Sequence, residues 1–559
     1  MTVAAIERRA ARGAWIAVGI GWMVVVSAVA AWLLATRADR LIEQLKAVQF
    51  WSLEACVVFV VALGVPALKG ALREVSRQDG VRIAGLMALA AVLTLFVAPR
   101  TNRIYYDEHI YQGIGHNLAD LRRAQVCNDA TVQYGRLQCQ FGEYNKQPYA
   151  YPHVLSVMYR LVGARSWVAH AVNAAAMALT AAAAYLLVWL LFGDRLAGWY
   201  AGLLVALTPE QILWSATAAV EPTASLAAVA ALVFVAHARR SASGVALFAA
   251  AAAVAYAVQF RPESFLIVPV AGVLIWPRAR RELGSVRLWW AGLLFVALSA
   301  VHLAHLFAVR DAGWGTSAAR LSLGYLAENF RANGAFFVMD GRFPVVFTLL
   351  ALVGLVGRTF RAERLALGLY FLLFFGIFLL FYAGSYNYGA DVRYSLLTVP
   401  AVAALGGLGA ARVARWFAGG AGARAAAVTA ALCLQFLWYL PLVRATGEEA
   451  WAARADVSFA HSFARELPSN AYVLTHNPGM FHLWGVSAGQ MSLVSSNPQY
   501  LDFLIDRYSA GVYLHWNFWC NVEEPVQPAF CRTALQLRPT ELAREHHERD
   551  QRFAFYRLK

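Results

Sequence analysis

Thirteen long apolar runs limit what this chain of 559 residues can fold into more than any other feature of its sequence. Most of the runs are long enough to cross a hydrocarbon layer of roughly 30 Å, and the short runs 265–276 and 344–357 are the weakest candidates. Only 14% of the residues are charged, whereas about a quarter are charged in an ordinary soluble domain. The sequence therefore predicts a mainly α-helical, polytopic membrane protein with about thirteen transmembrane helices. The runs are 13–35, 50–68, 83–98, 166–192, 196–215, 218–238, 243–260, 265–276, 288–309, 344–357, 365–384, 394–411 and 425–443.

Short arginine clusters between the runs predict how the helices are oriented. Basic residues favour the cytoplasmic side of a membrane, and with thirteen spans every cluster falls on one side. This places the N-terminus in the cytoplasm of a bacterial cell, and the segment after the third run and everything after about residue 444 in the periplasm, outside the inner membrane. The net charge of +15 is divided among these clusters, so no nucleic-acid partner is expected. The clusters are Arg8, Arg9 and Arg12; Arg73, Arg77 and Arg82; Arg239 and Arg240; Arg278, Arg280 and Arg281; Arg358, Arg361 and Arg364; and Arg412 and Arg415.

The chain divides into three predicted parts. Residues 1–98 hold three spans, and residues 99–443 hold a large outer loop (99–165) followed by ten spans. Residues 444–559 form a small soluble α/β domain outside the membrane, in which "EEAWAARADVSFAHSFAREL" has helical spacing and "AYVLTH", "MSLVSS" and "AGVYLHW" are typical of strands. Whether this domain binds an acceptor or only covers the site stays open.

Four of the six cysteines form two close pairs outside the membrane. Cys127 and Cys139 share the large loop, and Cys520 and Cys531 share the C-terminal domain. An oxidising periplasm favours two disulfides. Free or metal-binding thiols remain the alternative, although no CxxC spacing supports zinc.

Ionisable residues gather at the predicted outer membrane face. Such residues at membrane depth are costly and usually mark function. They are Asp107 and Glu108 after the third run, Lys146 in the large loop, Glu210 at the end of the fifth run, Glu221 at the start of the sixth, Arg261 and Glu263 at the end of the seventh, and Arg393 near the start of the twelfth.

Each of these residues also has a plainer explanation. An acidic pair beside a span is most often simply solvated. Glu221-Pro222 and Arg261-Pro262-Glu263 both fit the start of a helix, and Arg393 could reach phospholipid headgroups. The glycines of "QGIGHN" are a weak phosphate-loop signal because no strand precedes them.

Taken together, the residues favour a site for an anionic lipid. Lys146, Arg261 and Arg393 are cations on the side where the positive-inside rule disfavours them, and a lipid phosphate would explain them. Carboxylates beside such a phosphate suit glycosyl transfer from a lipid-linked sugar. One carboxylate would take the proton of an acceptor hydroxyl while the cations hold the departing phosphate.

Four stretches add a second line of argument. In this order and spacing they resemble the C-type glycosyltransferase superfamily, and within it the bacterial relatives of protein O-mannosyltransferases and aminoarabinose transferases (family 39-like enzymes). Two extra spans precede the family's usual first helix, and Lys146 is followed by Gln147-Pro148 rather than by two prolines. The stretches are "YYDEHIYQGIGHNLA", "EYNKQPYAYPHVLSVMYRLVGARSWVAHAVNAA", "RLAGWYAGLLVALTPEQILWSATAAVEPTASLAAVAALVFVA" and "DVRYSLLTVPAVAALGGLG".

The resemblance implies roles for individual residues. Asp107 would be the general base, Glu108 its neighbour or support, and Glu221 a second acidic site. Lys146 would contact the donor phosphate, helped by Arg393. The other substrate-binding candidates are Arg261, Glu210, Tyr394, Tyr149 and Tyr151.

The resemblance also implies an inverting transfer from a polyprenyl-phosphate sugar. The acceptor is undetermined among a protein, a lipid and an envelope glycan. No cofactor is expected, because the cations already do the charge-neutralising work of a metal. His109 or His116 could still bind a divalent metal, although their spacing matches no zinc motif.

Two other classes of function stay open. A lipid-linked glycan polymerase or ligase would use arginines in a late outer loop, and residues 310–344 supply Arg310, Arg320, Arg331 and Arg342. A transporter or a non-catalytic lipid-binding scaffold would need ionisable groups across the bundle, where His302 and His305 are the main candidates.

Overall fold

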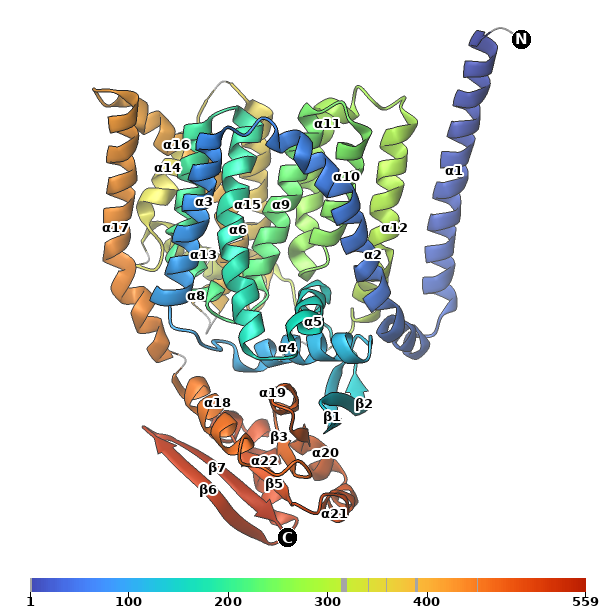
Figure 1. Ribbon diagram of the computed structural model, residues 1–559, viewed down its shortest axis with the longest axis vertical. Coiled ribbons are helices and arrows are strands. Elements are labelled where there is room, and N and C mark those ends of the chain that lie inside the picture. The colour runs from blue at the N-terminus through green and yellow to red at the C-terminus, as the bar shows by residue number, and fades with distance from the viewer. Residues whose placement is uncertain (1–2, 313–318, 340, 358, 388–390, 450) are drawn as a thin grey trace.

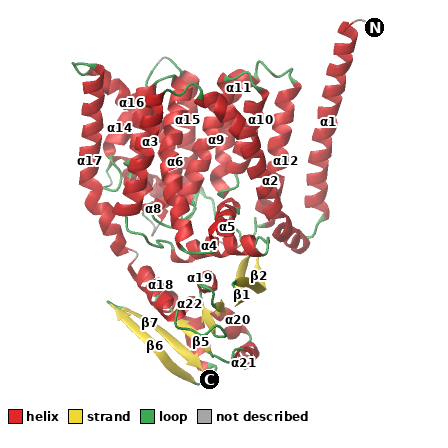
Figure 2. Ribbon diagram, in the orientation of Figure 1, coloured by secondary structure: helices red, strands yellow, loops and turns green. Residues whose placement is uncertain are grey.

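The computed structural model describes residues 3–312, 319–339, 341–357, 359–387, 391–449 and 451–559. Long helices stand side by side in a bundle, and a smaller mixed region of helices and strands lies at one end of it (Figure 1). Figure 2 shows that the strands are confined to this end. The protein is thus mostly helical, as predicted.

Fifteen α-helices make up the bundle in the described part of the chain; fourteen of them lie along the predicted apolar runs, every run falls on one or more of them, and α13 lies between the runs 288–309 and 344–357. The run 196–215 is divided between α7 and α8, and the run 83–98 ends in the short π-helical segment Leu93–Val97. The helices are α1 (Val3–Ala35), α2 (Ala38–Leu72), α3 (Arg77–Val92), α6 (Trp167–Phe192), α7 (Arg195–Ala206), α8 (Pro209–Ser215), α9 (Glu221–Arg240), α10 (Gly244–Ala257), α11 (Ile267–Ala279), α12 (Val286–Ala308), α13 (Leu326–Val338), α14 (Val345–Leu355), α15 (Arg361–Leu380), α16 (Val399–Trp416) and α17 (Ala421–Glu449).

Eight helices of the described chain are long and apolar enough to cross a membrane. The protein is therefore a multi-pass membrane protein, while the count of thirteen spans stays a prediction. Burial is uneven: 83% of the apolar window of α6 is buried, against 6% of that of α1. Helix α6 is thus at the centre of the bundle, and α1 stands at its edge (Figure 1).

Small residues let the central helices approach closely. A Cβ atom on Gly354 of α14 would lie 1.8 Å from the carbonyl oxygen of Leu405, and one on Gly409 of α16 would lie 1.9 Å from that of Leu350. Glycine at both positions is therefore required for the contact between α14 and α16. Close packing through small residues is the usual way in which helices associate in membranes.

Several arginine clusters meet at the end of the bundle away from the strands. Arg239 is paired with Glu363, and the Arg415 guanidinium with Asp194. Arg278 donates to the carbonyl oxygens of Ala238 and Ser241 at 2.6 and 2.7 Å. The connections α2–α3 and α16–α17 lie at this same end (Figure 1). Arg358 lies outside the described residues.

The predicted outer loop 99–165 is built mainly from regular elements. Helix α4 (Tyr105–Asp120) lies across the end of the bundle, and the hairpin of β1 (Val126–Gln133) and β2 (Arg136–Glu143) follows it. Helix α5 (Ala150–Val162) then leads back into the bundle. The sequence analysis did not predict these elements, since they are short and their apolar faces are completed by distant segments.

The hairpin and the C-terminal segment form one sheet of seven strands, in the order β2-β1-β4-β3-β5-β7-β6. Strands β3, β4 and β5 are parallel, and the outer pairs are antiparallel. The C-terminal elements are α18 (Trp451–Ala464), β3 (Tyr472–Thr475), α19 (Pro478–Leu483), β4 (Ser487–Gln490), α20 (Met491–Ser496), α21 (Pro498–Arg507), β5 (Val512–Trp516), a 3-10 turn (Phe518–Cys520), α22 (Val526–Gln536), β6 (Thr540–Glu548) and β7 (Gln551–Leu558).

Alternation along the strands gives the sheet two apolar faces. Val473 packs with Phe463 of α18 and Phe481 of α19 on one face, while its neighbours Tyr472 and Leu474 pack with α20, α21 and α22 on the other. Strands were correctly predicted at "AYVLTH" and "AGVYLHW". The prediction of a strand at "MSLVSS" is wrong, because these residues form α20 and β4 ends just before them.

Both predicted disulfides are present. Cys127–Cys139 crosses the β1–β2 hairpin, and Cys520–Cys531 joins the 3-10 turn to α22. Hydrogen bonds also tie the hairpin to the C-terminal segment, since Asp129 accepts from the Tyr472 hydroxyl at 2.5 Å. Residues far apart in the sequence thus make one unit at this end of the bundle.

The glycines of "QGIGHN" are packing residues on α4. Gly113 faces Gly479 of α19, where a Cβ on Gly479 would lie 3.4 Å from the Gly113 Cα. A Cβ on Gly115 would meet Leu155 of α5 at 2.9 Å. These two glycines let α19 and α5 approach α4, which accounts for them without a phosphate loop.

Candidate functional site

Five charged side chains meet where the bundle faces α4, and we refer to them as the charged cluster. They come from segments that are far apart in the sequence, which the fold brings to one place. The cluster consists of Asp107 on α4, Glu221 at the start of α9, Arg261 and Glu263 at the 3-10 turn Pro262–Leu266, and Arg393 on the 3-10 turn Asp391–Leu397.

Arg393 links the two acidic residues that the sequence singled out. Its Nη2 lies 3.6 Å from Asp107 Oδ2, and its Nε lies 2.9 Å from Glu221 Oε1. Arg261 contacts the same oxygen of Glu221, and it also pairs with Glu263. The second oxygen, Glu221 Oε2, is buried and accepts no hydrogen bond from the described residues. A ligand hydroxyl could donate to this oxygen.

The local sequence places each acid of the cluster at the start of a helix. Glu221 and Glu263 lie in the first turns of α9 and of the 3-10 turn, each next to a proline, and Asp107 lies in the first turn of α4. The positive end of a helix dipole stabilises negative charge. The same field would favour the phosphate of a ligand.

Asp107 is the member of the cluster most open to solvent, with 29% of its side chain exposed against 2% for Glu221. Its surroundings raise the pKa of Asp107 above the usual range, because desolvation disfavours the carboxylate and the nearby Glu221 charge adds to this effect, while Arg393 opposes it. A reachable carboxylate with a raised pKa is suited to accept a proton.

Lys146 and Arg320 are two further cations in this part of the molecule. Desolvation lowers the pKa of the half-buried Lys146, the Asp107 charge opposes this effect, and the positive charge of Arg320 adds to it. Lys146 is therefore close enough to both Asp107 and Arg320 to interact with them electrostatically. The sequence analysis placed Arg320 only in a competing hypothesis, because residues 310–344 are far from Lys146 along the chain.

Two tyrosines border the charged cluster. The guanidinium carbons of Arg393 and Arg261 lie 4.8 and 5.2 Å from the centre of the Tyr394 ring. Tyr111 is buried beside the cluster, where Asp107 and Glu221 raise the pKa of its phenol beyond the effect of burial. Tyr111 was not among the predicted site residues, although its position four residues after Asp107 places both on one face of α4.

Glu108 bonds to backbone N–H groups rather than to the side chains of the charged cluster. Its Oε1 accepts the N–H of Ile104 at 2.8 Å, and its Oε2 accepts the N–H of Ala218 at 2.9 Å. Its side chain is fully buried, and burial raises the pKa of Glu108 to about 8 against the effect of these hydrogen bonds. Glu108 thus fixes the start of α4 against the segment between α8 and α9.

Three other substrate-binding candidates are engaged elsewhere. Glu210 pairs with Arg103 at 3.2 Å and accepts from Trp214 Nε1 at 3.1 Å. Tyr149 and Tyr151 are fully buried, and their hydroxyls donate to the carbonyl oxygens of Asn145 and Ala218. The structure therefore does not bring these three residues into the charged cluster.

Metal binding has one geometrical candidate among the described residues, formed by His476, Cys520 and Cys531. The two cysteines are joined in a disulfide and offer no thiolate. In the charged cluster the carboxylates are paired with guanidinium groups. The expectation of a metal-independent enzyme stays a prediction.

Residues that would support the competing classes are mostly held by neighbours. Arg342 donates to the Asn387 side chain at 2.9 Å, and Arg310 pairs with Asp311 at 3.1 Å. The His302 ring stacks on Phe265 and on His305. His305 hydrogen-bonds the Tyr144 hydroxyl at 2.8 Å.

Known proteins share the fold of this chain. A family model described as dolichyl-phosphate-mannose-protein mannosyltransferase matches residues 146–305. ArnT from Cupriavidus metallidurans bound to undecaprenyl phosphate superposes with a TM-score of 0.54 at 16% identity, over 86% of this chain and 98% of that chain. The chain has the fold of the C-type glycosyltransferases. The apo state of the same ArnT gives a TM-score of 0.53 at 16% identity, with the same coverage of both chains.

A second C-type glycosyltransferase is less similar in structure. The oligosaccharyltransferase AglB from Archaeoglobus fulgidus, in complex with an inhibitory peptide and a dolichol-phosphate, gives a TM-score of 0.47 at 12% identity, over 78% of this chain and 69% of that chain. No curated protein sequence matches the chain. The similarity to the two ArnT structures thus shows the fold of this chain.

Proposed function

We propose that this protein transfers a sugar from a polyprenyl-phosphate donor to an acceptor hydroxyl, with Asp107 as the general base. The observation that carries the proposal is the position of Asp107, whose partly exposed carboxylate lies 3.6 Å from Arg393 within a cluster of cations and acids. A base beside a phosphate-binding cation is the arrangement that this reaction needs.

The reaction is a single displacement at the anomeric carbon. The acceptor hydroxyl gives its proton to Asp107 while its oxygen forms a bond to the anomeric carbon from the face opposite the phosphate. The bond between the anomeric carbon and the phosphate oxygen breaks, and its electron pair stays with the polyprenyl phosphate. One displacement inverts the anomeric configuration.

Arg393 and Lys146 would stabilise the charge that develops on the departing phosphate. Arginine suits this role because its guanidinium can form two parallel hydrogen bonds with phosphate oxygens. Arg261 holds Glu221 in place, and Glu221 Oε2 is left to accept a hydrogen bond from a donor hydroxyl. Tyr394 lies against both arginines and supports their orientation.

An apolar cavity of about 460 Å³ is suited to the polyprenyl chain. It lies among α2, α5, α6, α9 and α10, and its walls include Thr223, two residues after Glu221, as well as Leu226 and Phe234 further along α9. A lipid whose phosphate lies at the cluster could thus place part of its tail between these helices. The bound undecaprenyl phosphate of ArnT is a donor carrier of this class.

We infer from the arginines that the cluster faces the periplasm of a bacterial inner membrane. Arg239, Arg278 and Arg415 lie in the last turns of α9, α11 and α16, the helices that begin at or just after Glu221, Glu263 and Arg393 of the cluster. The positive-inside rule assigns the end of the bundle that holds these last turns to the cytoplasm.

The test is transfer by the purified full-length protein. It is incubated with a panel of radiolabelled polyprenyl-phosphate sugars and an extract of the native envelope, with and without EDTA. The proposal predicts a labelled product of inverted configuration whose formation survives EDTA. Strict dependence on a divalent metal would contradict the metal-independent mechanism. If an oligosaccharide diphosphate lipid is the required donor, the protein is a lipid-linked glycan polymerase or ligase. If the protein binds the polyprenyl-phosphate sugar but transfers nothing, the result supports a scaffold or transporter.

A further inference from the structure

A cavity of about 310 Å³ lies between the start of α4 and the C-terminal segment, and we refer to it as the interface pocket. Its walls include Tyr106 of α4, His476 after β3, Gln490 at the end of β4, Trp519 of the 3-10 turn, and Gln527 and Phe530 of α22. Its volume is at the lower end of the range for small-molecule sites. Both α4 and the C-terminal segment must be in place to form the interface pocket.

The walls of the interface pocket combine aromatic faces with neutral polar groups. The rings of Tyr106 and Trp519 meet edge to face with centroids 6.0 Å apart, and those of His476 and Phe530 are 6.5 Å apart. None of the lining side chains is an acid, a lysine or an arginine. This chemistry does not match a phosphate or an ammonium group. It matches a ring that has apolar C–H faces and hydroxyl groups at its edge.

Two ring nitrogens in this wall are left without partners. His476 is only 8% exposed, and its Nε2 makes no hydrogen bond with the described residues, nor does Trp519 Nε1. The Gln527 backbone lies close to the imidazole and opposes part of the lowering of the His476 pKa by burial. Buried polar atoms are nearly always hydrogen-bonded. Orphan groups in the wall of a cavity therefore point to a ligand that supplies oxygen atoms.

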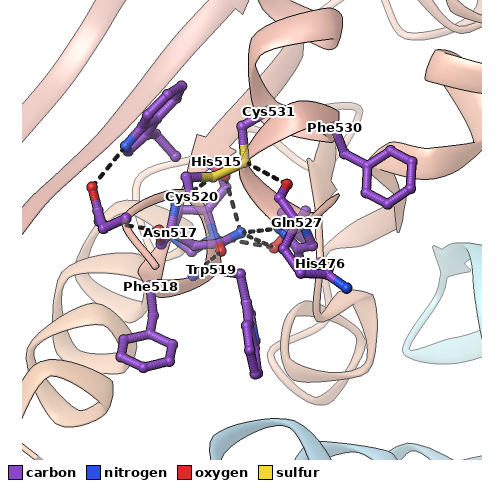
Figure 3. The surroundings of a disulfide bond; sticks show 12 residues. His476, His515, Asn517, Phe518, Trp519, Cys520, Gln527, Phe530 and Cys531 are labelled. Atoms are coloured by element: carbon purple, nitrogen blue, oxygen red, sulfur yellow. Dashed lines mark hydrogen bonds between the residues drawn. A yellow bond between two sulfur atoms is a disulfide. The ribbon is translucent and has the colours of Figure 1, made fainter. Parts of the chain in front are cut away.

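The neighbouring hydrogen bonds determine which proton His476 carries. Asn517 Oδ1 accepts the N–H of Trp519 at 2.9 Å, so its amide nitrogen faces His476 Nδ1, at 3.2 Å. Nδ1 therefore accepts, and Nε2 carries the proton. Burial lowers the pKa of His476 to about 4, so the ring is neutral near pH 7. In Figure 3 the His476 and Trp519 side chains lie beneath the Cys520–Cys531 disulfide.

One wall of the interface pocket is formed by Tyr106, the residue before the proposed base. Tyr106 precedes Asp107 in α4, and the Gln490 side chain lies close to its phenol. Burial and the charges of Asp107 and Glu143 raise the pKa of Tyr106. The Tyr106 phenol is thus close enough to interact electrostatically with the Asp107 carboxylate. A ligand group held in the pocket would have to extend past Tyr106 to reach Asp107.

We propose that the interface pocket binds a neutral sugar ring of the acceptor, so that the acceptor is a glycan and its reactive hydroxyl extends past Tyr106 to Asp107. This inference rests on the proposed glycosyl transfer. Trp519 and Tyr106 contact the faces of the ring, while His476 Nε2 and Trp519 Nε1 donate to its oxygens. A peptide acceptor is the competing reading.

The test is binding of neutral disaccharides to the full-length protein in detergent, followed by saturation-transfer-difference NMR. Cellobiose, chitobiose and α-1,2-mannobiose are the probes, and a serine- and threonine-rich peptide is the competitor. We expect saturable binding of at least one disaccharide, weakened tenfold or more in Trp519→Ala and in His476→Ala. Phe503→Ala, which changes an exposed aromatic on α21 outside the pocket, is expected to bind like the wild type.

Binding of undecaprenyl phosphate, measured on the same samples, separates this inference from the proposed function. If the lipid binds but no disaccharide does, or if the peptide displaces the disaccharide, the glycan assignment is wrong. If disaccharide binds and the lipid does not, the pocket assignment stands and the proposed donor is wrong. Should Trp519→Ala fail to fold, Gln527→Ala replaces it, and disaccharide binding unchanged in both Gln527→Ala and His476→Ala would overturn the inference.

Discussion

Replacing Arg393 by glutamine probes the electrostatics of the charged cluster. The substitution keeps a polar side chain but removes the positive charge that lies 3.6 Å from Asp107 and 2.9 Å from Glu221. Glu221 keeps Arg261 as its partner. The change therefore acts mainly on the donor phosphate and on the base, and less on the fold.

Two effects can be worked out from this geometry. A hydrogen bond to a charged group contributes about 1.5–3 kcal/mol, and since each 1.4 kcal/mol is a factor of ten, undecaprenyl phosphate should bind about 10- to 100-fold more weakly. Arg393 also gives the largest lowering contribution to the pKa of Asp107. Without Arg393 this pKa rises further, so the base becomes active only at higher pH.

The assay measures the dissociation constant of labelled undecaprenyl phosphate and the pH profile of kcat on purified protein. Arg532→Gln, on the exposed side of α22, is the matched control and should change neither. Weaker lipid binding together with a shift of the acidic limb to higher pH would support the reasoning. Unchanged lipid affinity, or a limb that moves to lower pH, would refute it.

Three further predictions follow from single features of the site. In the wild type, the raised pKa of Asp107 should place the acidic limb of the pH profile of kcat above the ordinary aspartate pKa of about 4, so activity increases as the pH rises through that limb. A limb at about pH 4 would contradict this prediction. Glu108→Gln leaves a backbone N–H facing an amide N–H, so thermal unfolding should show that the protein loses about 1–3 kcal/mol of stability. Its kcat should stay within about tenfold of the wild-type value, as expected of a positioning residue. A kcat as low as that of Asp107→Asn would make Glu108 catalytic. Replacing Cys127 and Cys139 by serine opens a loop with a sequence separation of 12, which should lower stability by about 3 kcal/mol; an unchanged unfolding midpoint would show that the sheet alone holds the hairpin.

The helices of the bundle could be predicted because each carries its own signal. A run such as 166–192 is apolar throughout, and its length alone identifies α6. The disulfides could be predicted from the positions of their cysteines outside the runs. Loop 99–165 carries no such signal, because α4 and the β1–β2 hairpin complete their apolar faces with residues more than 300 positions away, such as Gly479 and Tyr472.

The charged cluster was partly predictable for a similar reason. Asp107, Glu221 and Arg393 are each conspicuous as ionisable residues beside a membrane span, so they could be grouped before their contacts were known. Tyr149 and Tyr151 were grouped with them by resemblance, and only the packing shows that both are buried with their hydroxyls bonded to backbone carbonyl oxygens. The direction of a side chain depends on helix contacts that spacing in the sequence does not specify.

The most direct test of the central claim is the effect of Asp107→Asn on sugar transfer. Asparagine keeps the size of the side chain and removes its ability to take a proton. The account predicts that kcat falls about 10²- to 10⁴-fold, while undecaprenyl phosphate still binds within a few-fold of the wild-type affinity. Transfer at the wild-type rate by this variant would contradict the account and direct attention to Glu221 as the base.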